Sequence, residues 1–517
     1  MTTDLPLLQA LPAAQPRPSS GWWERMAHAC VRIPTRWYLV AMVALQIVLH
    51  VPFLSTPPLG QHTWRQVSWA APARNYYEEN GRFFYPQEDV RIAPEDRGYM
   101  YHEFPLLFWL IGQSYRVTGE HEINGRLMML GMAVVLLLAS YRLIKVLGYP
   151  ETTARWFVFF LGGAPEFFYY AITLEANLPA LAWFVLGLTL LVPALRSMRP
   201  NWQFWAGMGL ILLATLSKQT FLFFGLPIVF LFAYRYFRQR SRAMLWSFVA
   251  AGLIFLAAHG AIYRHTLFLY NQAPPERQVY WEKKATPPPH SWSEAWQDVT
   301  PALTLWIPQL YVNGAATPLF IAGLWVLAVR RRNNGEQRGF WLCWLASLAI
   351  FCGVFLIRLR EHEYYLTPLL MLTAFASAVG TEWLTSIPKV RWIALGFIVL
   401  VPVIMAGRIY PRWTIHTQVP DELLHHAGEV QALIPANARI IVVGDPSPYV
   451  YLYYLRRKGV NIPARSPARY VKFLTDRGFR WAVSSLSLRD TPHLASFSRI
   501  QGQVGRFRVI RIIPPSQ

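Results

Sequence analysis

The chain has 517 residues, of which 54% are hydrophobic, 15% aromatic and only 15% charged, with a formal net charge of +21. Soluble domains carry roughly 25% charged residues, so this composition excludes an ordinary soluble enzyme. The basic residues punctuate apolar runs, which is typical of a multi-span membrane protein and argues against a nucleic-acid partner. The three cysteines have neither a disulfide pattern nor metal-ligand spacing.

The membrane domain is predicted over residues 37–408, after a cytoplasmic N-terminal segment, 1–36. The first apolar run comes late and no small-residue cleavage site follows it, so a retained anchor is expected instead of a signal peptide. A spanning helix needs roughly 20 mainly apolar residues. The predicted spans are eleven: 37–54, 126–147, 153–172, 176–195, 203–217, 220–234, 243–262, 315–329, 340–357, 366–383 and 391–408.

Basic residues predict the orientation of these spans. Every second connection is short and basic, as in the connection with Arg142 and Lys145 and in the arginine run at 330–332. Such connections face the cytoplasm. The N-terminus is therefore predicted to be cytoplasmic, and the odd number of spans places the C-terminus on the extracytoplasmic side of the plasma (inner) membrane.

Two long connections are predicted on the extracytoplasmic side, at 55–125 and 263–314. In the first of them, the apolar segment 104–118 reaches only about 22 Å as a helix, which is too short to cross comfortably. We therefore expect it to lie on the membrane surface as an interfacial helix. The segment 64–79 has aromatic residues suited to the same zone and is predicted to do likewise.

The tail, residues 409–517, is long enough for a small domain of its own. Its β-branched runs ARIIVVGD, FRWAVSS and FRVIRII are predicted strands, and helices are expected between them, over 419–432 and 466–477. The fold class expected is an all-α polytopic membrane protein with a small α/β C-terminal extracytoplasmic domain.

Ionisable residues are almost absent from the middle of the predicted spans and gather instead at their outer ends and in the first loop. Intramembrane charges usually mark transport pathways or proton relays. Their scarcity here favours a reaction at the outer membrane interface over transport through the bilayer.

Several motifs occur along the chain in a recognisable order. The first loop contains HTWRQ, with His62, Arg65 and Gln66, and later GYMYHEFPLLFWL and NGRLMML. Further on come TLEANLPAL, LSKQT and EHEYYLTPLL. In this order and spacing the chain resembles the polytopic glycosyltransferases of the GT-C class, especially the bacterial relatives of protein O-mannosyltransferases and lipid A aminoarabinose transferases.

The resemblance implies transfer of a sugar from a polyprenyl-phosphate carrier to a hydroxyl of a lipid, protein or cell-envelope glycan. That reaction needs a carboxylate or other base for the acceptor proton, cations for the leaving phosphate, and an apolar groove for the lipid. The candidate bases are Glu103, Asp89, Glu175 and His62. The candidate groups for the carrier phosphate and lipid are Lys218, Arg65, Arg74, Gln66, His362, Tyr364 and Tyr365.

One feature departs from the family pattern, because positions 61–68 contain no acid where many members have an aspartate. The role of base then falls to one of the four candidates above. Each has a structural alternative. Glu103 and Glu175 stand where an acid favours a helix start, Asp89 lies in the string QEDVRIAPEDR as a solvated loop charge, and His62 can hydrogen-bond within its loop. The carboxylates also leave open a divalent cation, Mg or Mn, held between them.

Two other classes of function remain compatible with the sequence. A flippase or transporter for lipid-linked saccharides would show buried midplane charges and internal repeats. A non-catalytic membrane scaffold would bind partners through the C-terminal domain. The sequence defines neither the sugar nor the acceptor.

Overall fold

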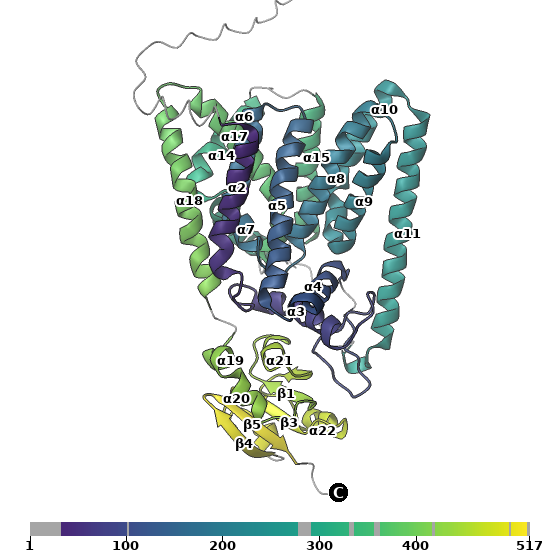
Figure 1. Ribbon diagram of the computed structural model, residues 1–517, viewed down its shortest axis with the longest axis vertical. Helices are drawn as coiled ribbons and strands as arrows, with labels where there is room; N and C mark the ends of the chain where they lie inside the picture. Colours follow the sequence, from purple (N-terminus) through teal and green to yellow (C-terminus); the bar gives the residue numbers. More distant parts are fainter. Residues whose placement is uncertain are drawn as a thin grey trace, which may run out of the picture.

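The computed structural model describes residues 33–100, 103–277, 291–329, 335–355, 362–415, 419–495 and 498–513. A bundle of long helices stands at one end of the molecule and a small sheet domain at the other (Figure 1). Most of the predicted segment 1–36, part of the loop 263–314 and the arginines at 330–332 lie outside the described residues.

The bundle has helices in all of the predicted spans. They are α2 (Thr35–His50), α5 (Glu122–Val146), α6 (Glu151–Gly162), α7 (Pro165–Tyr170), α8 (Asn177–Ser197), α9 (Trp202–Ser217), α10 (Leu226–Gln239), α11 (Arg242–Gln272), α14 (Thr317–Val329), α15 (Gly335–Val354), α17 (Leu369–Thr385) and α18 (Arg391–Thr414). In the described part of the chain five connecting helices are 3₁₀ or π: Val51–Phe53 after α2, Gln219–Gly225 before α10, Ala302–Tyr311 and Gly314–Ala316 before α14, and Glu363–Leu366 before α17. A short α13, Trp292–Pro301, leads into the π segment.

Within the part of the chain that the structure describes, seven helices are long and apolar enough to cross a membrane, or up to eight if the bent pair Ser293–Tyr311 and Gly314–Val329 counts as one. The helices α9 and α17 are apolar but have only 16 and 17 residues. The predicted span 153–172 is broken between α6 and α7 at Gly163, just before Pro165. Conversely, α11 continues to Gln272, beyond the predicted end of its span at 262.

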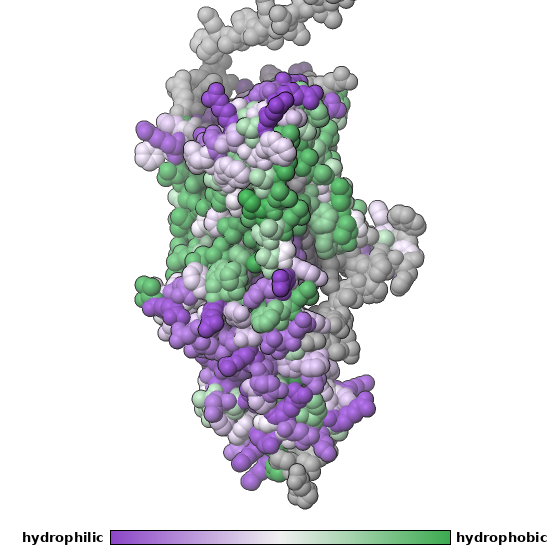
Figure 2. All heavy atoms as spheres, turned by 90° about the vertical axis from the view of Figure 1, so that its right-hand side faces the viewer, coloured by the Kyte–Doolittle hydropathy of each residue, from purple (hydrophilic) through white to green (hydrophobic). Residues whose placement is uncertain are grey.

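On the face that Figure 2 shows, an apolar belt covers the middle of the bundle, with hydrophilic surface at both of its ends. Large hydrophobic side chains on α2, α11 and α18 are widely exposed, including Val48, Leu256 and Val399. Inside the bundle small residues allow close packing, since a Cβ on Gly323 of α14 would lie 1.8 Å from the carbonyl oxygen of Ala376 on α17. The chain is a multi-pass integral membrane protein.

Two shorter helices, α3 (Thr63–Glu78) and α4 (Leu106–Thr118), lie across the end of the bundle that faces the sheet domain (Figure 1). Both were expected as helices in the first loop. However, α3 is buried along nearly its whole length, polar residues Arg65, Gln66, Arg74 and Asn75 included. These polar groups therefore need partners within the protein.

The C-terminal domain is a five-stranded mixed sheet in the order β2-β1-β3-β5-β4. Its strands are β1 (Ile440–Val443), β2 (Gly459–Ile462), β3 (Trp481–Ser484), β4 (Ser498–Val504) and β5 (Phe507–Ile512). β1, β2 and β3 are parallel, whereas β5 is antiparallel to β3 and β4. The helices beside the sheet are α19 (Asp421–His425), α20 (Ala427–Ala432), α21 (Val450–Tyr454), α22 (Ala468–Asp476) and α23 (Pro492–Ala495).

The first loop joins this sheet at its β2 edge. The N–H of Gly459 donates to the carbonyl of Asp89 at 2.9 Å, and the N–H of Arg91 donates to the carbonyl of Gly459 at 2.7 Å. An edge strand offers such unpaired backbone groups to a neighbouring segment. The loop is thereby fixed between the bundle and the C-terminal domain, and α3 with it.

Candidate functional site

The first turn of α3 carries a buried ion pair. The guanidinium of Arg65 donates to one carboxylate oxygen of Glu103, and the indole N–H of Trp69 donates to the other at 2.5 Å. Both charged side chains are only 9% exposed. The structure therefore brings together two of the predicted site residues and holds the carboxylate of Glu103 by both of its oxygens.

His62 stands immediately before α3 in a left-handed backbone conformation, with φ 56°. Its Nε2 lies 2.8 Å from Oε2 of Glu363, which precedes α17 and is fully buried. The imidazole also packs against the rings of Tyr364 and His362, with centroids 5.2 and 5.5 Å away. The motif around 362–365 and the start of α3 thus meet, although 301 residues separate His62 from Glu363.

Glu363 belongs to a larger buried network centred on Arg412, near the end of α18. Arg412 donates to one oxygen of Glu363 and, at 3.4 Å, to Glu166 on α7. The hydroxyl of Tyr311 donates to Glu166 at 3.1 Å, and that of Tyr170 to Glu363 at 3.2 Å. Burial opposes ionisation of Glu363, but the charges of His62 and Arg412 outweigh it and hold the pKa of Glu363 low.

Three members of this network were missed in the sequence: Glu363, Arg412 and Glu166. Glu166 offered a usable signal, because an acid inside a predicted span is rarely without function. Arg412 lies just past the last predicted span, and Glu363 lies inside a motif that was chosen for its aromatic residues.

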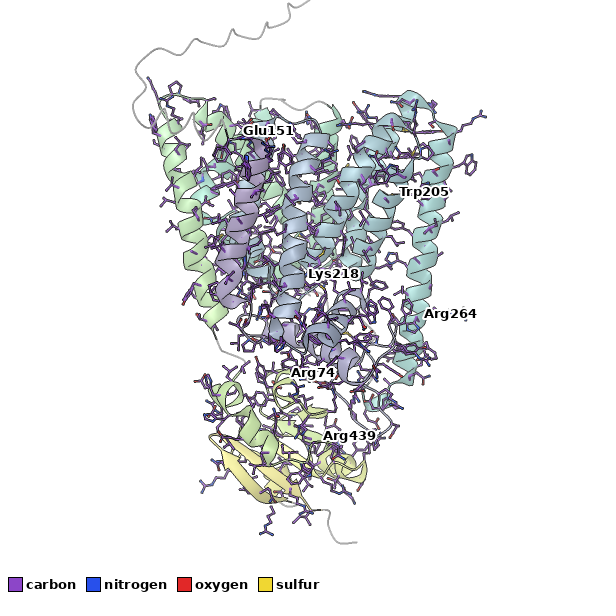
Figure 3. All side chains as sticks on the ribbon, in the orientation of Figure 1. Arg74, Glu151, Trp205, Lys218, Arg264 and Arg439 are labelled. Carbon is purple, nitrogen blue, oxygen red and sulfur yellow. The ribbon has the colours of Figure 1, made fainter. Side chains whose placement is uncertain are left out.

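Lys218 lies at the break between α9 and the 3₁₀ helix that follows, toward the end of the bundle that faces α3 (Figure 3). Its ammonium stands 4.9 Å from the ring centre of Tyr365. The positive charges of Lys218 and Arg65 both favour the ionised form of the buried carboxylate of Glu175. Five predicted residues therefore form one cluster: Arg65, Glu103, Glu175, Lys218 and Tyr365.

Within this cluster Glu175 has a clear structural task. Its Oε2 accepts from the backbone and side-chain nitrogens of Asn177 at 2.8 and 2.7 Å, and its Oε1 accepts from the N–H of Leu178 at 3.0 Å. These are orphan donors at the start of α8, so Glu175 caps that helix.

Arg74 and Asp89 lie elsewhere, at the junction with the C-terminal domain, where Figure 3 labels Arg74. They form a 2.5 Å ion pair, and the same carboxylate accepts from Lys458 at 2.7 Å and from Asn75 at 3.1 Å. Burial opposes ionisation of Asp89, yet the cations Arg74 and Lys458 hold its pKa well below the usual range. Arg74 is nine residues from Arg65, about 14 Å along α3.

Gln66 is fully buried and donates to the carbonyl of Leu59 at 2.6 Å, which fixes the approach of the loop to α3. Among the described residues no group of three or more His, Cys, Asp or Glu side chains could hold a metal ion. Arginines neutralise the carboxylates of Glu103, Asp89, Glu166 and Glu363 instead.

Comparison with known proteins finds one family model and several solved structures that resemble this chain. Residues 102–262 match the family of dolichyl-phosphate-mannose-protein mannosyltransferases. The structure is similar to apo ArnT from Cupriavidus metallidurans, with a TM-score of 0.57 at 13% sequence identity, over 92% of this chain and 98% of that one. The chain has the fold of the GT-C membrane glycosyltransferases. No curated protein matches it by sequence.

Two further GT-C structures are similar. The oligosaccharyltransferase of Archaeoglobus fulgidus matches with a TM-score of 0.54 at 14% identity, over 86% of this chain and 67% of that one. The arabinofuranosyltransferase AftD from Mycobacteria matches with a TM-score of 0.52 at 13% identity, over 93% of this chain and 40% of that one. The chain therefore shares its fold with these membrane glycosyltransferases.

Proposed function

We propose that this protein transfers a sugar from a polyprenyl-phosphate carrier to an acceptor hydroxyl at the extracytoplasmic face of the plasma membrane. A relative of the same fold, ArnT, has been solved bound to undecaprenyl phosphate. Another, AglB from Archaeoglobus fulgidus, has been solved with a dolichol-phosphate and an inhibitory peptide. The observation that carries the proposal is the convergence of Arg65 and Lys218 with Glu103 and His62 at one end of the bundle.

The distribution of charge supports this orientation, with eleven crossings as the sequence predicts. Lys145 and Arg155 pair with Glu151, which lies at the end of the bundle away from the C-terminal domain (Figure 3). At the same end Arg196 donates to the carbonyls of the last residue of α5 and of the residue after it. Both Arg196 and Arg235 pair with Glu336. Basic connections favour the cytoplasm, which leaves the candidate site on the other side.

Lys218 and Arg65 are the groups we assign to the carrier phosphate. Among the described residues no carboxylate lies within 4.0 Å of the ammonium of Lys218, which stands 4.9 Å from the ring centre of Tyr365. A cation held in this way is available to an incoming anion. As the bond from the sugar to the phosphate breaks, the leaving oxygen gains negative charge, which both cations stabilise.

We assign the proton transfer to His62. Asp89 and Glu175 are engaged in ion pairs and in a helix cap, and both oxygens of Glu103 are bonded. His62 is instead oriented by the carboxylate of Glu363, the arrangement that fixes an imidazole to accept a proton and stabilises the imidazolium formed. The acceptor hydroxyl loses its proton to His62, its oxygen bonds to the anomeric carbon, and the phosphate leaves with the bonding electrons.

The carboxylate that orients His62 is itself held in place. Glu363 is bonded to Arg412, which also pairs with Glu166 in the same buried network. Glu103 remains the alternative base, since it lies beside the same first turn of α3.

The test is sugar transfer by the purified protein in nanodiscs, with a panel of radiolabelled polyprenyl-phosphate sugars and a membrane-glycan extract. We expect wild type to transfer, and His62→Asn and Lys218→Ala to lose at least 100-fold in rate. The matched controls are His426→Asn, from an exposed His–Glu pair in the C-terminal domain, and exposed Lys389→Ala, and both should keep wild-type rates.

Loss in Glu103→Gln but not in His62→Asn would move the base to Glu103. Full activity in Lys218→Ala would remove Lys218 from the phosphate site. If the folded wild type transfers no sugar from any donor, the proposed activity is rejected. The flippase and the scaffold are then the remaining alternatives.

A further inference from the structure

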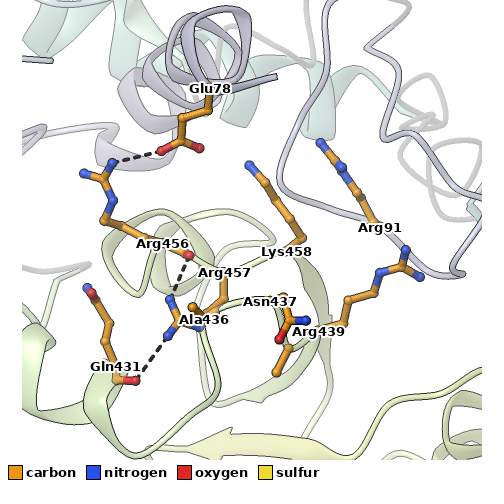
Figure 4. A pocket seen from close by; sticks show the side chains of 10 residues that line it. Glu78, Arg91, Gln431, Ala436, Asn437, Arg439, Arg456, Arg457 and Lys458 are labelled. Carbon is orange, nitrogen blue, oxygen red and sulfur yellow. Dashed lines mark hydrogen bonds and ion pairs between the residues drawn. The ribbon is translucent and has the colours of Figure 1, made fainter. Parts of the chain in front are cut away.

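A second polar site lies outside the cluster around Arg65. A pocket of about 450 Å³ opens where the end of α3 and the first loop meet the C-terminal domain (Figure 4). Its lining contains four arginines and one lysine but a single carboxylate, that of Glu78. The cations come from three separate parts of the chain: Arg91, Arg439 and the segment 456–458.

Three of these five cations have carboxylate partners within the protein. The pairs are Arg91 with Glu79 at 2.6 Å, Arg456 with Glu78 at 2.9 Å and Glu120 at 2.6 Å, and Lys458 with Asp89 at 2.7 Å. These pairs account for the attachment of the loop to the domain. They leave the charges of Arg439 and Arg457 to be explained.

Arg457 is only 8% exposed. Its guanidinium donates only to backbone carbonyls, among them those of Gln431 at 3.1 Å and Ile434 at 2.9 Å, and its Nε has no hydrogen-bond partner. In the described part of the chain no carboxylate lies within 4.0 Å of it. Burial of a cation without a counter-ion is costly, and accordingly burial lowers the pKa of Arg457.

Arg439 lines the same pocket, and it too has a nitrogen without a hydrogen-bond partner. One of its terminal nitrogens donates to the carbonyl of Pro94 at 2.6 Å, while the other, Nη1, is buried without a hydrogen-bond partner. Burial and the like charge of Arg91 together lower the pKa of Arg439. An anion bound in the pocket would favour the charged form of Arg439 and so offset both of these effects on its pKa.

The acids whose charges act on Arg439 do not supply that anion. Glu95 and Asp96 act on Arg439 only from beyond ion-pair distance. Glu95 lies 3.6 Å from Arg477, and Asp96 lies 3.1 Å from Arg277. Among the described residues, the charges of Arg439 and Arg457 are therefore not balanced by an ion pair.

We propose that this pocket binds a phosphate group, held by Arg439 and attracted by the uncompensated charge of Arg457. The terminal N–H groups of Arg457 already donate to backbone carbonyls, so its contribution is its charge. Guanidinium groups match the geometry of phosphate oxygens, and two uncompensated cations suit a dianion. The volume exceeds that of one phosphate, so the pocket also accommodates part of the molecule that carries it. The site lies beyond α3 and is independent of the sugar-transfer proposal, since neither Arg65 nor Lys218 lines it.

The experiment is titration of the full-length protein, in nanodiscs of phosphatidylcholine, with inorganic phosphate at constant ionic strength. Binding is followed by isothermal calorimetry and by the shift in melting temperature. Arg439→Gln should weaken phosphate binding at least tenfold. Arg469→Gln is the matched control, because it removes the same charge from an exposed position on α22 of the same domain.

Arg457→Gln removes several bonds to the backbone, so its circular dichroism and gel-filtration profile must match wild type before its titration is used. A second arm replaces part of the phosphatidylcholine with phosphatidic acid. If this lipid competes with inorganic phosphate in wild type, the natural phosphate is a lipid headgroup; if it does not, the phosphate is soluble, and both results support the pocket. Equal binding in Arg439→Gln and Arg469→Gln, or equal binding of chloride and phosphate, overturns the proposal.

Discussion

The carboxylate of Asp89, in the first loop, accepts a 2.7 Å ion pair from Lys458, which lies 369 residues later in the C-terminal domain. The same carboxylate is bonded to Arg74 on α3 at 2.5 Å. One acid therefore connects the helix that carries Arg65 to the sheet domain. Beside it the backbone of the loop bonds to Gly459 at the edge of the sheet.

We predict that Asp89→Asn loosens this connection. The change leaves the buried guanidinium of Arg74 without its main counter-charge, and removing one partner of a buried ion pair costs about 3–5 kcal/mol. Hydrogen–deuterium exchange should rise in β2 and in the loop around Asp89, and the melting temperature should fall. Glu429→Gln, from an exposed pair, is the control, and unchanged exchange in Asp89→Asn would show that the ion pair does not hold the domain.

Glu363→Gln tests the orientation of His62. The amide keeps a hydrogen-bonding group but removes the anion that stabilises a protonated imidazole. We expect kcat for sugar transfer to fall at least tenfold, KM for the donor to stay within twofold, and the rate–pH profile to move toward lower pH. Because Arg412 loses a partner as well, the thermal stability must be measured in parallel.

An unshifted pH profile, with a loss of rate that matches the loss of folded protein, would assign Glu363 to folding alone. Tyr170→Phe provides a milder comparison, because it removes a 3.2 Å hydrogen bond to the same carboxylate without changing charge. It should leave the pH profile in place.

The helical fold could be predicted from apolar runs because a spanning segment must satisfy its backbone within one helix. The exact ends could not, since α11 runs on to Gln272 through a stretch that is polar in sequence but still helical. Of the five strands, β2 and β4 were missed. β2 has only four residues, GVNI, and β4 is an edge strand, SRIQGQV, with no apolar run.

The candidate site could be predicted only in part for a related reason. Sequence motifs identified His62, Arg65, Glu103 and Lys218. Each of these residues stands at a helix end or in the loop that precedes a helix, where the motif is a continuous stretch of sequence. The pairing of His62 with Glu363 depends on contact between distant segments, which no local pattern encodes. The ion pair between Asp89 and Lys458 also depends on contact between distant segments. It holds Asp89 at the C-terminal domain, away from the Arg65 cluster.

Glu175 is predicted to matter for stability more than for chemistry. Glu175→Ala removes three hydrogen bonds at the start of α8, and loss of a helix cap costs about 0.5–2 kcal/mol. The variant should melt at lower temperature, while the rate of transfer per folded molecule stays within a fewfold of wild type. Glu175→Gln should recover part of the stability, because one oxygen acceptor remains. A rate loss of 100-fold or more in folded Glu175→Gln would instead make Glu175 a catalytic residue.

Asp445 gives the C-terminal domain a predicted dependence on pH. It follows β1 and is nearly buried, accepting from the N–H groups of Ser447 at 2.8 Å and Tyr451 at 2.7 Å. Burial outweighs these bonds and raises the pKa of Asp445 to about 7. In the unfolded chain the pKa of an aspartate is about 3.9.

Between these two values the folded state holds a proton that the unfolded state has lost, so the free energy of unfolding must decrease as pH rises from about 4 to about 7. We expect hydrogen exchange in β1 and α21, corrected for the intrinsic pH effect, to show protection falling over this window. Asp445→Asn, which cannot ionise, should abolish the trend, and exposed Asp476→Asn should keep it. An unchanged trend in Asp445→Asn would assign the pH dependence to another group, because no titration remains at residue 445 in that variant.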